Sequence, residues 1–215
     1  MGINNELPYG ATPIDPEEAE GLIPSISTRA ELNAFEALNI AEALGWAHGN
    51  RKNHRDLLSI ETLRLLHKRM FNKTWRWAGA IRITEKSIGV APHQILPCLR
   101  ALTDDVKVWL DFGSYPPREI SARFHHRLVQ IHPFPNGNGR HARFATDLLC
   151  ERQGWMLSEW GSTPSSAVER HRRCFLNLPW VLCRRFVSLR FVGFYACGKC
   201  KAEFVEQYIE VWLGR

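Results

Sequence analysis

The stretch HPFPNGNGR occupies residues 132–140, and Arg143 follows three residues after it. It joins a histidine, a glycine-rich turn and two arginines within one loop and one helical turn. Each part suits the handling of a phosphate-containing group that moves from a nucleotide to an acceptor. The stretch therefore predicts a phosphate-handling site at the start of a helix.

His132 is the candidate base of this site. The proline that follows disfavours helical dihedrals at His132 and turns the chain out into a loop. Imidazole titrates near neutral pH, so a histidine can take a proton from an attacking hydroxyl. A single histidine is more often structural, and it is the joint pattern that favours a catalytic role. Phe134 is expected to be an apolar anchor that fixes the loop.

Asn136–Gly139 is a glycine-rich turn, and a helix is expected directly after it. Glycine permits positive φ and lets backbone N–H groups approach an anion closely. A helix N-terminus adds unpaired N–H donors and a favourable dipole. Arg140 and Arg143 lie three apart on one helical face, where their planar guanidinium groups can grip phosphates. The pattern is neither a Walker A loop nor the spaced glycine motif of dinucleotide-binding folds.

These residues resemble the motif of the Fic/Doc (Fido) family, HPFx(D/E)GNGRxxR, and depart from it at one position. The resemblance implies a mainly α fold, a Fic-type helical bundle with a small β-hairpin flap. It also implies a protein adenylyltransferase that moves AMP from ATP, with Mg²⁺ or Mn²⁺, to a protein hydroxyl. His132 would activate the hydroxyl, Gly137, Asn138 and Gly139 would cradle the phosphates, Arg140 would hold them, and Arg143 would hold the γ-phosphate.

Asn136 is the departure, because the family usually has a carboxylate there that binds Mg²⁺. An amide offers one neutral oxygen, whereas a hard cation prefers charged oxygen. We therefore expect Asn136 to be a weak metal ligand, with the nucleotide phosphates supplying most of the others. Phe134 and Asn136 complete the ATP-binding set that the resemblance implies. Gly139 separates the chain from the Doc branch, which resembles a kinase and carries Lys there.

A hairpin is predicted before the motif. Residues 75–84 and 88–92 carry alternating patterns, with a polar break at 85–87 between them. In the family, a hairpin flap docks the target by strand addition. The predicted docking line consists of Ile83, Thr84, Glu85 and Lys86.

Residues 25–32 predict the start of a helix, in which Glu31 has two possible roles. It lies three residues after Thr28, in a capping-box position. Many Fic proteins also carry an inhibitory helix with the motif (S/T)xxxE(G/N), whose glutamate pairs with the second motif arginine and blocks productive ATP binding. Ser27 and Glu31 match this motif, Leu32 departs from it, and Glu36 is a second candidate.

The chain has 215 residues and is 45% hydrophobic, which suffices for one domain with a sizeable core. We expect a partly ordered N-terminal arm over 1–24, a Fic domain over 25–163 that includes the inhibitory helix, and an atypical basic segment over 164–215. Periodic patterns predict helices at Arg29–Asn50, Ser59–Phe71, Pro92–Phe112, Pro117–Ile131 and Arg140–Gln153.

The C-terminal segment differs in character from the rest. Between Gly161 and Ala196 the only acid is Glu169, among many arginines. A shifted reading frame or a recombined end is one hypothesis for this. The sequence CGKC at 197–200 resembles half of a zinc knuckle, but a structural zinc needs four ligands. We therefore expect cytosolic free thiols rather than structural zinc.

The location and the partners are predicted from bulk properties and from the resemblance. No apolar leader is evident, and arginines interrupt the apolar region at 181–197, so we expect a cytoplasmic protein without a membrane span. The net charge of +6 permits nucleic-acid contact. No basic stripe precedes Pro164, however, so we expect no nucleic-acid partner. The chain looks most like the mobile mystery protein B group, whose members travel beside a helix-turn-helix protein. That likeness implies a regulatory helix-turn-helix partner in a toxin–antitoxin-like pair.

Two alternatives stay open from the sequence. The first is another Fic-type transfer of a phosphate-containing group, or removal of AMP, because the site residues would be nearly the same. The second is a binding module with weak or no catalysis, motivated by Asn136 and by the unusual C-terminal segment.

Overall fold

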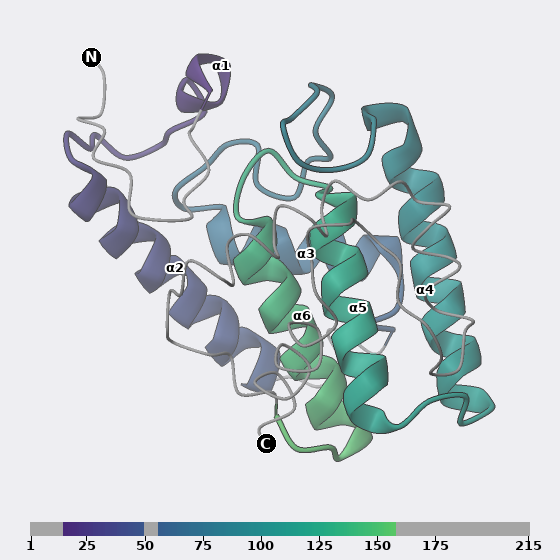
Figure 1. Ribbon diagram of the computed structural model, residues 1–215. Helices are drawn as coiled ribbons and strands as arrows, with labels where there is room; N and C mark the ends of the chain where they lie inside the picture. Colours follow the sequence, from purple (N-terminus) through teal and green to yellow (C-terminus); the bar gives the residue numbers. More distant parts are fainter. Residues whose placement is uncertain (1–14, 50–55, 158–215) are drawn as a thin grey trace, which may run out of the picture. The chain divides into compact units, whose positions relative to one another are not determined.

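The computed structural model describes residues 15–49 and 56–157, and these residues are mainly helical (Figure 1). The elements are α1 (Pro16–Ala19), α2 (Arg29–Gly49), α3 (Ile60–Phe71), the 3-10 turn η2 (Pro92–Gln94), α4 (Ile95–Asp111), α5 (Pro117–Ile131) and α6 (Asn138–Gln153). All five helices predicted from periodicity are confirmed. The third begins with the 3-10 turn, and the fifth begins at Asn138 rather than Arg140.

The helices pack around α3, α5 and α6. In Figure 1, α5 lies beside both α4 and α6, and the contacts between elements agree. Helix α3 contacts α2, α4 and α6, so it closes the bundle from the other side. The buried side chains include Leu63, Leu66, Phe71, Leu99, Leu102, Val106, Phe124, Leu128, Ala145 and Leu148. The core therefore lies directly behind the loop that joins α5 to α6.

Local sequence explains where these helices begin and end. The hydroxyl of Ser59 accepts a hydrogen bond from the backbone N–H of Thr62 at 3.2 Å and caps α3. Helix α5 ends at His132, and α6 runs between Gly137 and Gly154, both of which have positive φ. Together, these ends leave a short loop at 132–137 between two packed helices.

The predicted β-hairpin at 75–92 is wrong as a strand pairing. We find no strand in the parts of the chain that the structure describes, and the segment consists of turns and bends. The side chain of Arg82 lies between the two arms and donates to carbonyl groups of both, at Thr84 and Val90. An alternating sequence pattern cannot reveal that a buried arginine side chain, rather than backbone hydrogen bonds between two strands, holds the two halves of this segment together.

Part of the predicted N-terminal arm is described, and it packs against the start of the same segment. Leu22 forms an isolated antiparallel bridge with Trp75. The N–H of Ile23 donates to the carbonyl of Thr74 at 2.9 Å, and the N–H of Arg76 donates to that of Gly21 at 2.8 Å. Residues 21–23 are therefore paired with residues 74–76. The predictions for residues 1–14 and 164–215, including the cysteine pair at 197–200, lie outside the described residues.

Candidate active site

His132 ends helix α5 in the left-handed conformation, with φ 53° and ψ 60°. Among the described residues, it is the one non-glycine residue with positive φ. Its N–H still donates to the carbonyl of Leu128 at 3.3 Å, so the helix continues up to this residue before the chain turns. Its exposed fraction is 7%. Strained backbone of this kind persists only where the surroundings hold it, and it is concentrated at functional sites.

Arg82 holds the backbone of His132 in place. Its Nε donates to the carbonyl of His132 at 2.6 Å, and its own N–H donates to the carbonyl of Pro133 at 3.0 Å. Its other guanidinium nitrogens donate to Thr84 and Val90. The side chain is buried, and burial lowers the pKa of its guanidinium group. Arg82 thus links the segment before the motif to the candidate base, and sequence reasoning missed it.

Gly89 permits this close packing. A Cβ placed there would lie 2.7 Å from both Nη2 of Arg82 and Cβ of His132, and φ is +115°. Both the space and the backbone conformation therefore require glycine. The segment 82–90 and the end of α5 form one packed unit.

The loop after His132 is closed by a reciprocal pair of hydrogen bonds. The N–H of Phe134 donates to Oδ1 of Asn138 at 2.9 Å, and Nδ2 of Asn138 donates to the carbonyl of Phe134 at 2.8 Å. Phe134 itself is fully buried and anchors the loop. The side chain of Asn138 thus shapes the loop from within, while its backbone belongs to the first turn of α6.

Gly137 is the N-cap of α6, with φ 78°. A Cβ at this position would lie 2.6 Å from the ring of Phe71. By contrast, a Cβ at Gly139 would meet no atom within 4 Å. Gly137 is required by the fold, whereas Gly139 leaves open space where an anion can approach the first N–H groups of the helix.

The motif is buried at its start and exposed at its second arginine, with Asn138 buried between them. His132 and Phe134 are buried, Gly139 and Arg140 are partly exposed, and Arg143 is exposed. The predicted phosphate-binding residues therefore lie together at the N-terminus of α6, next to His132.

The side-chain oxygen of Asn136 is already engaged within its own loop. Its Oδ1 accepts a hydrogen bond from the N–H of Gly137 at 2.6 Å. In the parts of the chain that are described, no group of three or more His, Cys, Asp or Glu side chains could hold a metal ion. Asn136 itself can offer a divalent ion one neutral oxygen, which a hard cation binds less well than a carboxylate.

In the structure, the carboxylate of Glu31 occupies the capping position predicted for it. Its Oε2 accepts from the N–H groups of Ser27 at 2.9 Å and Thr28 at 3.1 Å. The first of these bonds is the larger cause that holds the pKa of the carboxyl below its usual value. The prediction that Glu31 is the inhibitory residue places its carboxylate at a motif arginine, and the cap engages it elsewhere.

Glu36, the second candidate, is the residue that contacts the motif. Its Oε2 accepts from Nη1 of Arg140 at 2.8 Å, and its Oε1 accepts from Nε1 of Trp75 at 2.8 Å. The guanidinium group of Arg140 also lies over the ring of Phe71, 4.9 Å from its centroid. An N-terminal glutamate therefore does meet a motif arginine, although it is the first arginine rather than the second.

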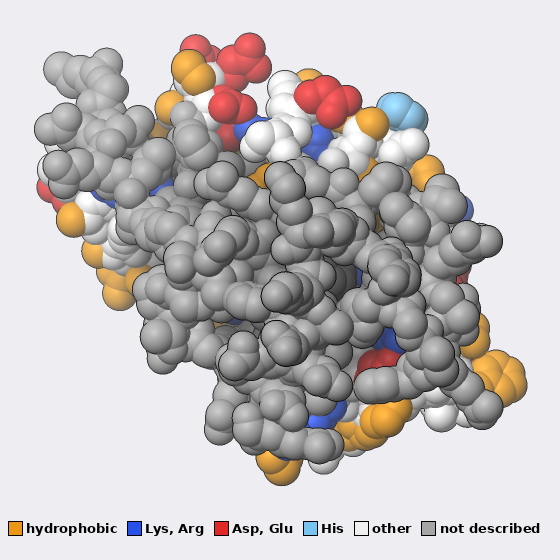
Figure 2. All heavy atoms as spheres, viewed as in Figure 1, with side chains coloured by type: hydrophobic (Ala, Val, Ile, Leu, Met, Phe, Trp, Pro, Cys, Tyr) orange, Lys and Arg blue, Asp and Glu red, His pale blue; other side chains and the backbone are white. Residues whose placement is uncertain are grey.

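The predicted docking line is divided in the structure. Ile83 is 89% exposed, and Thr84 and Glu85 are exposed too. The side chain of Lys86 is only 7% exposed and forms ion pairs with Asp15 and Glu18. Lys86 thus ties the segment to the acidic residues that gather around α1 (Figure 2) rather than facing a target.

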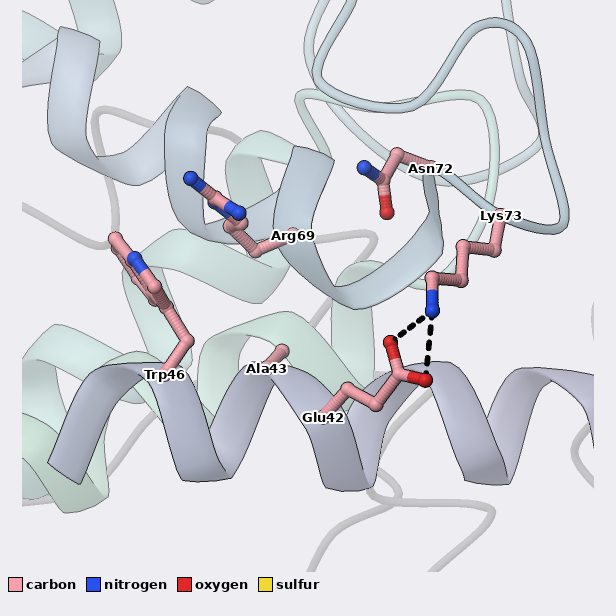
Figure 3. A pocket seen from close by; sticks show the side chains of 6 residues that line it. All are labelled: Glu42, Ala43, Trp46, Arg69, Asn72 and Lys73. Atoms are coloured by element: carbon pink, nitrogen blue, oxygen red, sulfur yellow. Dashed lines mark hydrogen bonds and ion pairs between the residues drawn. The ribbon is translucent and has the colours of Figure 1, made fainter. Parts of the chain in front are cut away.

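A small pocket of about 110 Å³ lies between α2 and the end of α3 (Figure 3). It is lined by Glu42, Ala43, Trp46, Arg69, Asn72 and Lys73. Glu42 forms an ion pair with Lys73, and the guanidinium group of Arg69 lies over the ring of Trp46. No motif residue lines it, and its charged groups already contact one another, so the candidate site remains the loop at 132–143.

The comparisons with known proteins agree with this site. Residues 57–150 match the model of the Fic/DOC family. The protein adenylyltransferase fic-1 of Caenorhabditis briggsae is 36% identical over 112 residues, which cover 48% of this chain and 21% of that protein. The protein adenylyltransferase Fic of Nematostella vectensis is 29% identical over 139 residues, covering 61% of this chain and 32% of that protein. The chain thus spans between a fifth and a third of these relatives.

Solved structures share the fold. Fic-1 (residues 134–508) of Caenorhabditis elegans aligns with a TM-score of 0.57 at 24% identity, covering 92% of this chain and 55% of that one. The BepC protein of Bartonella tribocorum with bound AMPPNP aligns with a TM-score of 0.54 at 19% identity, covering 73% of this chain and 88% of that one. Residues 57–150 thus match the Fic/DOC family model, and the fold of the chain is that of solved Fic proteins.

Proposed function

We propose that this protein is a protein adenylyltransferase, which transfers AMP from ATP to a hydroxyl side chain of a protein. One observation supports this most strongly: His132 and the open N-terminal turn of α6 lie at the two ends of one short, hydrogen-bonded loop. The relatives named protein adenylyltransferases support the choice of AMP as the transferred group. The chain covers only part of those relatives, so the substrate belongs to the proposal.

In the proposed reaction, the imidazole of His132 takes the proton of the target hydroxyl. The hydroxyl oxygen then attacks the α-phosphorus, the bond to the β-phosphate oxygen breaks, and pyrophosphate leaves. The N–H groups at the start of α6, together with Arg140 and Arg143, bind the phosphates and stabilise the charge that develops on them. The exposed residues Ile83–Glu85 would hold the target segment near His132.

A divalent ion would neutralise charge on the phosphates when it is bound with the nucleotide. Asn136 is the motif residue placed to contact it, through an oxygen that now accepts from Gly137. The BepC protein was solved with bound AMPPNP, and the N-terminal Fic domain of a Bartonella quintana protein with bound ADP. The nucleotides bound to these similar proteins support ATP as the nucleotide of this chain.

We further propose that Glu36 restrains this activity. Its carboxylate holds Arg140, which the phosphates of ATP need as a partner, so ATP must displace it to bind fully. Because Trp75 also donates to Glu36, the restraint depends on a buried contact as well as on charge. The helix-turn-helix partner and the cytoplasmic location stay predictions from the sequence. No helix among residues 15–49 and 56–157 is long and apolar enough to cross a membrane.

The proposal is tested with ATP labelled at the α- or the γ-phosphate, incubated with the protein, Mg²⁺ or Mn²⁺ and a cell lysate. Protein-bound label from the α-position alone, lost in His132→Ala, is the expected result. Label from the γ-position would instead show a kinase. No label from wild type or from Glu36→Gln would favour a binding module.

A further inference from the structure

His67 lies directly beneath the anion-binding loop, although it belongs to helix α3 and to no part of the motif. It is fully buried and stacks on Phe134, with ring centroids 3.7 Å apart and an angle of 18° between the planes. Phe71 and His141 border it, at 4.7 and 5.6 Å between ring centroids. The proposed reaction gives this histidine no chemical step.

Two hydrogen bonds determine which nitrogen of His67 carries the proton. The backbone N–H of Gly79 donates to Nδ1 at 2.9 Å, so Nδ1 must be the acceptor with a free lone pair. Nε2 then carries the hydrogen and donates to the carbonyl of Asn136 at 3.0 Å. Burial, followed by the neighbouring His141, lowers the pKa of His67 well below its usual value, which keeps the ring neutral.

The bond to Asn136 fixes the orientation of one peptide group in the loop. The peptide between Asn136 and Gly137 is trans, so its C=O and its N–H point to opposite sides. Because His67 holds the carbonyl inward, the N–H of Gly137 points away from the core. There it meets Oδ1 of Asn136, an oxygen that a phosphate oxygen can replace.

We propose that His67 is a positioning residue, which presents the N–H of Gly137 to the phosphates of ATP by holding the carbonyl of Asn136. The proposal rests on the proposed function, since it assigns that N–H to the nucleotide. A histidine that served packing alone would tolerate loss of the loop bond as long as the variant stayed folded, because MgATP binding would then not depend on that bond.

Two substitutions separate the two hydrogen bonds. In His67→Asn, the amide lies where Nδ1 lay, so it can accept from Gly79 but cannot reach Asn136. In His67→Gln, the longer amide reaches the position of Nε2 and can donate to Asn136. We expect MgATP binding, measured by calorimetry, to weaken about tenfold in His67→Asn, as for the loss of one positioned hydrogen bond, and to change little in His67→Gln.

Thermal unfolding of each variant shows whether it folds. A folded His67→Asn that binds MgATP like wild type would overturn the proposal, and so would a folded His67→Gln that binds it as weakly as His67→Asn is expected to. If His67→Asn does not fold, the MgATP affinity of His67→Gln decides: an affinity near that of wild type supports the proposal, and a clearly weaker one contradicts it. If wild type itself binds no MgATP, the proposed function fails rather than the role of His67.

The tautomer is tested in the wild-type protein without any substitution. Long-range ¹H–¹⁵N NMR spectra of ¹⁵N-histidine protein should show a protonated Nε2 and an unprotonated Nδ1 for His67 at neutral pH. Addition of MgATP should shift the Nε2 resonance, because the loop that it contacts binds the ligand. The opposite tautomer would contradict the proposal even if ATP binds.

Discussion

Glu36 and Arg140 are 104 positions apart in the chain, yet they form an ion pair of 2.8 Å between Oε2 and Nη1. The carboxylate comes from the middle of α2, and its side chain is only 5% exposed, whereas that of Arg140 is 39% exposed. Trp75 donates to the other carboxylate oxygen. The contact therefore joins α2, the segment after α3 and the first turn of α6 at the site where ATP is expected.

Substitution of Glu36 by Gln should increase ATP binding. The amide oxygen can still accept from Trp75, while the charge that holds Arg140 is removed. A partly exposed ion pair contributes about 1 kcal/mol, so the affinity for MgATP should rise about fivefold. Calorimetry with MgATP measures this, and self-labelling with α-labelled ATP should rise in parallel.

The control for this prediction is Glu31→Gln. That glutamate caps α2 through Ser27 and Thr28, so its substitution should lower the stability of the helix and leave ATP affinity unchanged. A rise in ATP affinity in Glu31→Gln, with none in Glu36→Gln, would return the inhibitory role to Glu31.

Asn136→Asp should lower the Mg²⁺ concentration that AMP transfer requires. The aspartate keeps an oxygen that can accept from Gly137, and it adds the negative charge that a hard cation prefers. We expect the Mg²⁺ concentration for half-maximal AMP transfer to fall several-fold. A Mg²⁺ titration at saturating ATP measures it; an unchanged midpoint would show that residue 136 does not approach the metal.

Arg82→Lys should slow the reaction more than it weakens nucleotide binding. Lysine keeps the positive charge, but it cannot reach the carbonyls of His132, Thr84 and Val90 together as the planar guanidinium group does. Because a misplaced base loses rate steeply, kcat should fall by about tenfold to a hundredfold.

Two comparisons control the Arg82 prediction. The KM for ATP should stay within about twofold, because Arg82 contacts no residue of the phosphate side. Arg123→Lys alters a partly buried arginine that pairs with Glu119 on α5 and lies over the ring of Tyr115, and it should leave both constants unchanged. Equal losses in kcat from both variants would point to a general effect on folding.

The helices could be predicted from the sequence because their apolar positions repeat with helical spacing. In α4, the buried residues Ile95, Leu99, Leu102, Val106 and Trp109 lie three or four apart, and each contributes to one face. The turn at His132 could be predicted as well, since Pro133 acts locally. Structural features that depend on residues close together in the sequence could thus be predicted.

Contacts between distant segments could not be predicted in this way. Glu36 and Arg140 meet only after α2 and α6 pack. The local sequence motif instead favoured Glu31 as the inhibitory residue, because Glu31 matches that motif better than Glu36 does. Arg82 followed an alternating pattern, which suggested a strand and an exposed side chain. A signal was present for His67, because it lies on the buried face of α3 with Leu63, Leu66 and Met70. A polar residue in such a position often has a buried partner.

The two motif glycines should respond in opposite ways to alanine. Gly137→Ala forces a side chain onto a φ of +78° and against Phe71, and it should lower the free energy of unfolding by about 1–3 kcal/mol. Gly139→Ala meets open space within a helix, so it should leave that free energy unchanged or raise it by about 0.5–1 kcal/mol. Its methyl group lies where the phosphates should approach, so MgATP binding should weaken. Urea unfolding and calorimetry on both variants check this; tight MgATP binding by Gly139→Ala would remove the phosphates from this turn.

Stability should fall as the pH drops below neutrality, because buried histidines must stay neutral in the folded protein. Burial lowers the pKa of His141 from 6.5 to about 4, while its Nε2 donates to the carbonyl of Leu63 at 2.9 Å. Between these two values the unfolded chain binds the extra proton and the folded chain does not, so the free energy of unfolding decreases as the pH falls.

This single histidine should contribute a slope on the order of 1.4 kcal/mol per pH unit in that window. Urea unfolding at several pH values from 7 to 4.5 measures the slope. In His141→Gln, whose amide can donate to Leu63 without titrating, the slope should be smaller by about that amount. If His141→Gln kept the full slope, the loss of stability at low pH would have to come from other groups.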